Sequence, residues 1–524
     1  MTEAVEFDYV VVGAGSAGCA VAARLSEDPG VTVALVEAGG PDDHPDIAVP
    51  LGALELFGSA VDWDFPTLAQ PGLGGREVRW PRGRVLGGSS STNFQMWVPG
   101  HAEDFASWHP SWSWDHVRPY FRKAERWAGE PADGGAFGRD GPLWIAPQRD
   151  PDPSTARFLD ACVAAGLKPV AGGLGGPDNS GCAPTPVTQS AGARWSCADG
   201  YLRPAAARPN LTVLTGGPVH RVLLSDGRAT GVRLADRILT ARREVVLSAG
   251  AVGSPHLLLL SGIGDPDELR AAGVAPRVDL PEVGRGLHDH LILDLAVHAP
   301  AATRFLEDAR DRYERYRMGP LTSNIGEAVA FLRADGGAGP PDLELIWSPM
   351  AFGDDGTPLP GYTVGVVLLR PESRGRLTLA DTDPATAPRI DPGYLTAEAD
   401  VRTYTAGVRF AERILDSAAL RPLHRGPVAP WPAGDAVADY IRARAQTVFH
   451  PVGSCRIGAV VDEHLRVRGV PGLRVVDASV IPEAPRGHTH AHAVMIGERG
   501  ADLIRRAWKK NRTGADNERP VIPR

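Results

Sequence analysis

The first part of the chain passes from an apolar run through a glycine-rich turn into a helical pattern. Residues 9–12 are a short β-branched run, residues 13–18 read G-A-G-S-A-G, and residues 19–25 carry apolar side chains at helical spacing. A second apolar run, 31–36, ends on Glu37, about 20 residues after the last glycine of the turn. This order of strand, glycine turn, helix, strand and acid predicts a dinucleotide-binding α/β unit.

The residues of this turn each have a physical role in the prediction. Gly13 permits a tight turn, Gly15 lets the backbone approach a pyrophosphate, and Gly18 lets the helix pack closely on the strand. The helix N-terminus offers free N–H groups to an anion, and Glu37 can accept the hydroxyls of an adenosine ribose. NAD and FAD share this fingerprint, so it does not choose between them, and a glycine turn followed by a surface glutamate is the alternative.

Glycine and other small residues recur in later stretches of the chain. Residues 80–93 contain Pro81 and the run G-G-S-S-S, which predicts a backbone loop that closes on a ligand, with a flexible linker as the alternative. Residues 244–264 repeat the order of strand, glycine turn, helix and glycine stop, and residues 473–482 precede a histidine-rich segment. Parts of one nucleotide site are therefore spread over nearly the whole chain.

Composition and charge exclude several classes of function. The chain has 524 residues, with 55 basic against 63 acidic side chains and a net charge of −8, whereas a nucleic-acid-binding face is basic. The 5 cysteines form no C-x-x-C pair, which argues against a disulfide framework or a thiolate zinc site. No apolar stretch approaches the roughly 20 residues of a membrane helix. We expect a cytoplasmic protein that neither inserts into a membrane nor binds nucleic acid.

The glycine-rich stretches, in this order, resemble the glucose-methanol-choline (GMC) family of FAD-dependent alcohol oxidoreductases. Residues 83–93 resemble the first signature of the family and residues 250–264 its second, and the resemblance extends from residue 7 to residue 505. The chain is most similar to the bacterial branch that is like choline dehydrogenase. The resemblance implies an α/β fold: a Rossmann-like FAD-binding domain of the glutathione-reductase type, with an inserted α+β substrate domain built on an antiparallel sheet.

The resemblance also implies where FAD binds. The adenosine is expected at Glu37, the pyrophosphate at residues 13–18 and the isoalloxazine against residues 87–93. Thr92 stands where some family members attach the flavin covalently to a histidine, so we expect noncovalent FAD. The residues that the family motifs assign to FAD are Gly13, Gly15, Ser16, Ala17, Gly18, Glu37, Ala38, Arg82, Val85, Gly87, Gly88, Ser89, Asn93, Val219, Ala249, Asp477, Ala478 and His490.

Two histidines near the end of the chain carry the expected chemistry. His450 lies in H-P-V-G, where Pro451 and Gly453 end a helical pattern, and a lone histidine at such an element end is more often structural. By resemblance, His450 faces the flavin N5 and His488 completes a catalytic pair with it. The helical pattern that begins near residue 491 places a positive helix end beside the pair, which favours neutral imidazole, the form that accepts a proton. His450 is the expected base.

The segment around His488 reads G-H-T-H-A-H, and three alternate histidines can also indicate a metal site. Such a site needs a further ligand and a carboxylate close by, and Glu498 lies too far along the predicted helix, so we expect no metal. By resemblance His490 lies near the pyrimidine edge of the flavin, whereas His492 has no assigned role. A serine hydrolase is disfavoured because no G-x-S-x-G elbow is complete.

The intervening segments predict a second domain. Strand-like runs such as 343–346 and 362–369 indicate an antiparallel sheet. Ser323, Asn324 and Glu327 lie in a stretch similar to one that lines the family's pocket, and they either contact substrate or form a satisfied polar loop. We expect an FAD-binding domain from residues 1–150, 193–296 and 446–510, a substrate-binding domain from 151–192 and 297–445, and a flexible tail from 511–524.

Together with these patterns, the resemblance implies an FAD-dependent oxidoreductase acting on CH-OH donors. It oxidises a primary or secondary alcohol to an aldehyde or ketone by hydride transfer to flavin N5, with a histidine as base. The partners are a small alcohol and oxygen or another electron acceptor, and an oligomer is possible. The alternative is a GMC-fold flavoprotein with non-oxidative chemistry, as a lyase or decarboxylase, or with flavin binding only. The sequence specifies neither the alcohol nor the acceptor.

Overall fold

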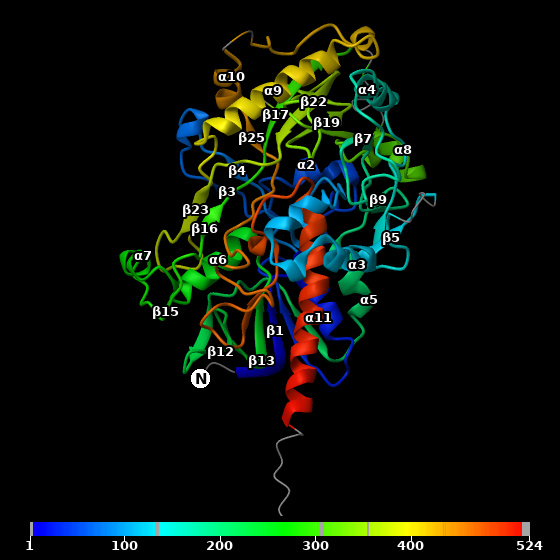
Figure 1. Ribbon diagram of the computed structural model, residues 1–524. Coiled ribbons are helices and arrows are strands. Elements are labelled where there is room, and N and C mark those ends of the chain that lie inside the picture. Colours follow the sequence, from blue (N-terminus) through cyan, green and yellow to red (C-terminus); the bar gives the residue numbers. More distant parts are fainter. Residues whose placement is uncertain are drawn as a thin grey trace, which may run out of the picture.

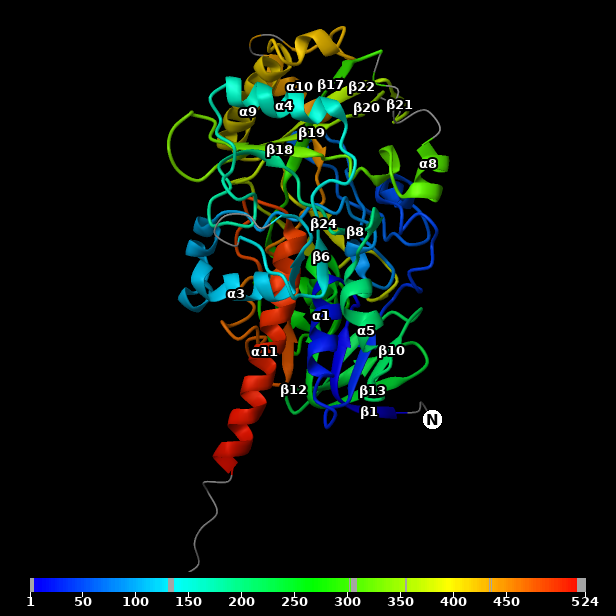
Figure 2. The ribbon, with the colours of Figure 1, turned by 90° about the vertical axis from the view of Figure 1, so that its right-hand side faces the viewer.

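The computed structural model describes residues 4–130, 136–300, 302, 309–353, 356–432, 434 and 436–515. Two large sheets lie toward opposite ends of the molecule, and the long helix α11 (Thr489–Ala515) begins between them and runs down beside the first sheet (Figures 1 and 2). The predicted fold class, a Rossmann-like α/β domain combined with a domain on an antiparallel sheet, is confirmed.

The first sheet has the strand order β10-β2-β1-β13-β12-β11, and β26 also pairs with β13. Its centre is parallel, since β1 pairs in parallel with β2 and β13, whereas β12 and β11 are antiparallel. Central parallel strands are buried on both faces, which is why residues 9–12 and 33–36 are apolar without alternation. The strands are β1 (Ala4–Val12), β2 (Val33–Val36), β10 (Leu211–Leu214), β11 (Arg221–Ser225), β12 (Arg228–Arg233), β13 (Ile238–Leu247) and β26 (Leu473–Val475).

Helices cover this sheet and bring distant segments together. α1 (Ser16–Leu25) follows the glycine turn and packs against α11, where a side chain on Gly497 would lie 2.6 Å from the carbonyl oxygen of Ala17. α6 (Gly250–Leu260) follows β13 and is almost entirely buried, as expected for a helix that is apolar all round. The close approach of α1 and α11 therefore depends on small residues.

A buried carboxylate fixes the axial position of α11. Glu498 is fully buried and accepts hydrogen bonds from the Arg24 guanidinium at 2.7 to 3.0 Å and from the Tyr201 hydroxyl at 2.9 Å. The Nζ of Lys123 forms an ion pair with Oε2 of Glu498 at 2.7 Å. A shift of the helix would leave this buried charge without its partners, which is strongly unfavourable, so these contacts help to hold the histidines at the N-terminus of α11 in place.

The second sheet is antiparallel, in the order β25-β17-β22-β19-β18-β7. Helix α9 (Glu398–Leu415) packs on β22 and β19, and Gly407 allows this because a side chain there would lie 2.8 Å from Val366. The strands are β7 (Gly181–Pro184), β17 (Leu291–His298), β18 (Ala328–Leu332), β19 (Leu343–Ser348), β22 (Gly361–Leu368) and β25 (Gln446–Thr447).

Shorter elements complete the described chain. The helices are α2 (Ala53–Leu56), α3 (Trp114–Ala124), α4 (Pro153–Ala164), α5 (Arg203–Ala205), α7 (Pro266–Ala271), α8 (Ala309–Tyr316) and α10 (Ala436–Arg444). The strands are β3 (Phe65–Pro66), β4 (Arg79–Trp80), β5 (Glu125–Trp127), β6 (Leu143–Ile145), β8 (Gln189–Ser190), β9 (Ala193–Arg194), β14 (Ile263–Gly264), β15 (Val278–Asp279), β16 (Arg285–Leu287), β20 (Ala351–Phe352), β21 (Pro358–Leu359), β23 (Gly375–Thr378) and β24 (Arg389–Asp391).

The chain crosses between the two sheets at places that differ from the expected boundaries. β17 enters the second sheet at Leu291, before the expected change at residue 297, and β25 still pairs with β17 after the expected change at residue 446. α11 also continues to Ala515, beyond the expected start of the tail at residue 511, and residues 516–524 lie outside the described residues. We therefore propose that the second part of the substrate-binding domain begins at Leu291 and ends at Thr447.

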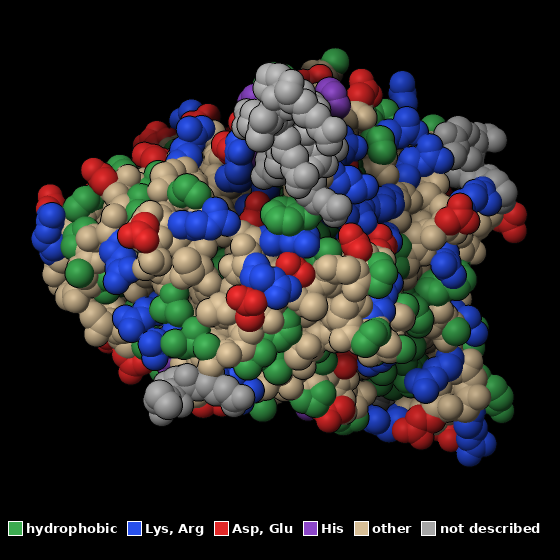
Figure 3. Space-filling model, turned by 90° about the horizontal axis from the view of Figure 1, so that it is seen from below, with side chains coloured by type: hydrophobic (Ala, Val, Ile, Leu, Met, Phe, Trp, Pro, Cys, Tyr) green, Lys and Arg blue, Asp and Glu red, His purple; other side chains and the backbone are tan. Residues whose placement is uncertain are grey.

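The surface carries both signs of charge. Seen from below, Lys and Arg side chains are interspersed with Asp and Glu side chains around the end of the first sheet (Figure 3). Among the helices in the described part of the chain, none combines the length and the apolar composition that crossing a bilayer requires.

Candidate active site

A cavity of about 400 Å³ extends from the carboxyl ends of the parallel strands to the N-terminus of α11. Open α/β sheets bind their ligands at this end of the strands. The cavity lining includes Gly13, Gly15, Ser16, Ala17, Glu37, Ala38, Arg82, Gly88, Ser89, Asn93, Val219, Ala249, Asp477, Ala478, His450, His488 and His490. The structure thus brings most of the sequence-predicted site residues to one cavity.

The glycine turn forms one wall of the cavity from backbone atoms. A side chain on Gly13, whose φ is +98°, would lie 2.5 Å from the Ser248 carbonyl oxygen, and one on Gly18 would lie 1.9 Å from the Gly13 oxygen. A side chain on Gly15, in contrast, would meet nothing within 4 Å. Gly13 and Gly18 therefore serve close packing, while Gly15 borders open space that a pyrophosphate can occupy.

Two buried carboxylates frame the ends of this wall. Glu37 accepts hydrogen bonds from the backbone N–H groups of Ala14 and Gly39, each at 2.9 Å, and burial raises its pKa. Asp477 accepts bonds from the N–H of Gly250 at 2.9 Å and the hydroxyls of Ser254 and Ser479 at 2.5 Å, and burial raises its pKa too. Glu37 keeps lone pairs for ribose hydroxyls, whereas Asp477 mainly ties α6 to the segment after β26.

The loop that follows β4 closes over the glycine turn. The Gly87 N–H donates to the Ala14 oxygen at 2.8 Å, and a side chain on Gly88 would lie 2.6 Å from the Gly15 Cα. Arg194 holds the far end of the loop by donating to the Asn93 backbone oxygen at 2.6 Å. This loop is bonded at both ends, so the flexible-linker alternative does not hold.

Three residues expected to contact FAD do not line the cavity. Gly18 packs beneath Gly13, Gly87 supports the loop through Ala14, and Val85 is fully buried. These residues act by holding the lining residues in place.

The imidazoles of His450 and His488 face each other at the α11 end of the cavity, with ring centroids 4.8 Å apart and planes at 84°. The His450 backbone N–H donates to Asp289 at 2.7 Å, and the His488 backbone N–H donates to the Val98 oxygen at 3.0 Å. Burial lowers the pKa of His450 well below its ordinary value, and the neighbouring His488 adds to this effect. His450 is therefore neutral at ordinary pH and can accept a proton.

Each ring has a different partner behind it. A ring nitrogen of His488, Nε2, lies 3.0 Å from Oε1 of the fully buried Glu344 on β19. The His450 Nδ1 lies 3.0 Å from Nδ1 of His290. Neither partner was found from the sequence. The available signals were a lone acid inside the apolar strand L-E-L-I-W and the H-D-H run at residues 288–290.

The other two histidines of the segment have separate environments. The His490 Nδ1 lies 3.1 Å from the Ser16 hydroxyl, and burial lowers its pKa to about 4. His492 is fully buried away from the cavity and stacks on Phe105, with ring centroids 5.6 Å apart. This gives His492 a packing role that the sequence did not reveal. Among the described residues, no cluster of His, Cys, Asp or Glu could hold a metal ion.

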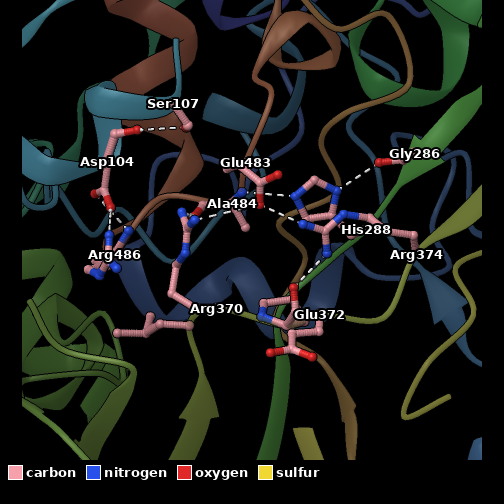
Figure 4. Close-up of polar contacts among 12 residues, drawn as sticks. Asp104, Ser107, Gly286, His288, Arg370, Glu372, Arg374, Glu483, Ala484 and Arg486 are labelled. Carbon is pink, nitrogen blue, oxygen red and sulfur yellow. Dashed lines mark hydrogen bonds and ion pairs between the residues drawn. The ribbon is translucent and has the colours of Figure 1, made fainter. Parts of the chain in front are cut away.

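Polar contacts clamp the loop that leads into His488 (Figure 4). Arg486 donates to Asp104 through its backbone N–H at 2.8 Å and its guanidinium at 2.7 Å. The Ala484 N–H donates to Nε2 of His288 at 2.9 Å, and its carbonyl oxygen accepts from Arg370 at 3.0 Å. Since contacts from several segments fix this loop, the position of His488 is set before α11 begins.

None of Ser323, Asn324 and Glu327, which the sequence offers as candidate substrate contacts, lines the cavity. Glu327 accepts hydrogen bonds from Ser323 at 2.7 Å and from Thr155 at 2.6 Å. Asn324 donates to the Phe94 backbone oxygen at 2.9 Å. Their polar atoms are satisfied within the protein, which is the second alternative that the sequence left open.

Three phenylalanines form an apolar wall beside His450. Phe57 lies 5.6 Å from Phe94 and 5.2 Å from Phe449 between ring centroids, and all three line the cavity. Phe449 has a φ of +69°, a left-handed conformation that is strained for a bulky residue. Arg82 donates to its carbonyl oxygen at 2.7 Å and so helps to hold it.

Comparison with known proteins gives a consistent picture. Models of the family described as GMC oxidoreductase match residues 7–292 and 371–497. A GMC-type oxidoreductase of Mycobacterium tuberculosis is 45% identical over 95% of this chain and 99% of that protein, and the alcohol dehydrogenase (acceptor) of Pseudomonas putida is 38% identical over 95% of both. The structure of pyridoxine 4-oxidase from Mesorbium loti matches with a TM-score of 0.87 and 32% identity, over 95% of this chain and 99% of that chain.

The contrast between Gly15 and Gly18 predicts opposite effects of an added methyl group. Gly15→Ala leaves the fold and its thermal stability unchanged but obstructs the pyrophosphate, which costs about 1–3 kcal/mol of binding, or roughly 10- to 100-fold in FAD affinity. Gly18→Ala destabilises the unliganded protein because its side chain meets the Gly13 oxygen. Thermal unfolding of the apoprotein and titration with FAD check both, and a Gly15→Ala protein that retains normal FAD affinity contradicts the assignment.

Proposed function

The chain belongs to the GMC oxidoreductase family, and from this premise we propose that it oxidises a primary or secondary alcohol to an aldehyde or ketone. It is an FAD-dependent oxidoreductase that acts on CH-OH donors. The observation that carries the proposal is the pair of facing imidazoles, His450 and His488, at the end of a cavity whose other end fits a dinucleotide. This pair favours redox turnover over a lyase or a protein that only binds flavin.

The chemistry divides between the cofactor and the histidine pair. FAD, when bound, supplies the acceptor for the hydride that leaves the alcohol carbon. His450 and His488 hold the substrate hydroxyl between them, and His450 takes its proton. The carboxylate of Glu344, which lies against His488, favours the positive charge that the pair gains. Burial keeps water away from this proton and strengthens each of these interactions.

The cavity also indicates the class of alcohol. Among the described lining residues, the charged side chains are Glu37, Asp477 and Arg82, and the two acids belong to the nucleotide end. Of these three, Arg82 is the one beside the histidines: its positive charge helps to lower the pKa of His450, and it donates to Phe449 in the apolar wall of Phe57, Phe94 and Phe449. Among the described lining residues, no carboxylate stands at this end to pair with a quaternary ammonium group, and Glu344 is engaged with His488 outside the lining. We therefore propose an uncharged alcohol with an apolar body as substrate.

The cellular setting of this reaction is also a proposal. All five cysteines are buried free thiols, which suits a reducing compartment. We propose that the protein acts in the cytoplasm on a small alcohol, with oxygen or another acceptor as the oxidant.

The role of His450 predicts a large kinetic effect. His450→Ala lowers the rate constant of anaerobic flavin reduction by roughly 10²–10⁴, because a positioned base is lost. Stopped-flow absorbance with the best alcohol measures this, and His464→Ala, which removes an exposed histidine, is the control. An unchanged rate in His450→Ala removes His450 from the mechanism.

The apolar wall predicts a substrate preference. An aromatic or medium-length aliphatic alcohol should exceed choline in kcat/KM by roughly 10- to 100-fold, the worth of burying one apolar group. Phe57→Ala should reduce this advantage while leaving reduction by a small alcohol unchanged. Anaerobic bleaching across a panel of alcohols decides the matter, and faster bleaching by choline would refute the preference.

Thr92, which lines the cavity, predicts that FAD is held without a covalent bond. A threonine hydroxyl lacks the imidazole nitrogen that carries the flavin in covalently linked family members. Acid precipitation of the yellow protein should release all the flavin into the supernatant. Flavin that stays with the precipitate would contradict this prediction.

A further inference from the structure

His290 lies directly behind His450, outside the cavity. It precedes β17 and is fully buried, and its ring meets that of His450 edge to face, with centroids 5.2 Å apart and planes at 83°. Both ring nitrogens of His290 are engaged. Nε2 lies 3.0 Å from the Leu369 carbonyl oxygen, and Nδ1 lies 3.0 Å from Nδ1 of His450.

The positions of the protons follow from this chain of contacts. A carbonyl oxygen can only accept, so Nε2 of His290 carries a hydrogen and donates it to Leu369. Burial lowers the pKa of His290 to about 3, so the ring is neutral and its Nδ1 bears a lone pair. The His450 Nδ1 must then carry the hydrogen of the bond between the two rings. Because His450 is also neutral, its lone pair is on Nε2.

We propose that His290 is a positioning residue that holds His450 in the tautomer with a proton on Nδ1 and a free lone pair on Nε2. The proposal rests on the proposed function, in which His450 takes the hydroxyl proton. The Leu369 carbonyl, directly after β22, sets the protonation of His290, since a backbone carbonyl oxygen can only accept a hydrogen bond. His290 in turn determines which ring nitrogen of His450 carries the hydrogen, and His450 is the ring that contacts substrate.

The same arrangement suits the step itself. When Nε2 of His450 takes the proton, its Nδ1–H continues to donate to the lone pair of His290, so no hydrogen bond has to break or reverse. The residue before His290 fixes the backbone, since Asp289 accepts from the His450 N–H at 2.7 Å and from the hydroxyls of Thr447 and Tyr394. Two consecutive residues thus control the main chain and the tautomer of His450.

The wild-type holoenzyme provides the first test. In protein labelled with ¹⁵N at its 15 histidines, the ring signals of His450 are identified by their loss in His450→Gln. We expect a protonated Nδ1 and an unprotonated Nε2 at neutral pH. A protonated Nε2 on His450 overturns the proposal, whether or not any alcohol reduces the flavin, so this test is separate from that of the proposed function.

Two substitutions of His290 provide the second test. His290→Leu removes both hydrogen bonds and lets the other tautomer of His450 form. We expect flavin reduction to slow by roughly 10- to 100-fold, a part of what a positioned base contributes, with KM within about twofold. In His290→Gln the amide oxygen can accept from His450 and the amide N–H can donate to Leu369, so we expect most of the rate and the Nδ1-protonated signal to return.

A matched control separates this role from a loss of stability. His424 is also a buried histidine whose Nε2 lies 3.0 Å from a backbone oxygen, that of Leu415, but it lies outside the cavity lining. His424→Leu should lower thermal stability as His290→Leu does while keeping the wild-type rate of flavin reduction. The proposal is overturned if His290→Leu reduces flavin at the wild-type rate, or if His424→Leu slows it equally.

Discussion

The close approach of backbone to backbone around Gly13 is the constraint on which the rest of the site depends. No side chain fits between Gly13 and Ser248, the residue after β13, or between Gly18 and Gly13. Because these positions are glycines, β1, β13 and α1 converge on one point, and the loop at Gly88 can rest on Gly15. The resulting wall offers N–H groups and a helix end rather than side chains, which is what an extended phosphate-bearing ligand requires.

The opposite end of the cavity is lined by buried side chains, which are shielded from water. His450 and His488 are buried between the two sheets, and each is fixed by a group from the second sheet or the segment that leads into it, His290 for one and Glu344 for the other. Burial favours the neutral imidazole of His450, and hydrogen bonding decides which nitrogen is free to react. The glycine turn beside the first sheet thus contributes the ligand-binding backbone, whereas β19 and the residue that precedes β17 contribute the groups that orient the reactive rings.

Several features could be predicted because they depend on local order along the chain. The glycine turn and the acid after the second strand are each recognisable within a few residues, whereas the role of the histidine at H-P-V-G came from the resemblance to the GMC family. The two alternatives for Ser323, Asn324 and Glu327 could not be separated, because a polar loop has the same sequence pattern whether it faces a cavity or is hydrogen-bonded within the protein. The role of His492 could not be predicted from the sequence either, because His492 packs on Phe105, which lies far away along the chain.

The sequence by itself therefore determined the fold class and the dinucleotide turn, since strand and helix periodicity and glycine spacing are local properties, and its resemblance to the GMC family identified the two facing histidines. Only the tertiary structure decided how those histidines differ. Glu344 lies on a strand 144 residues away from His488, and His290 lies 160 residues away from His450. Protonation and tautomer depend on burial and on partners at hydrogen-bond distance, and these exist only once both sheets have come together.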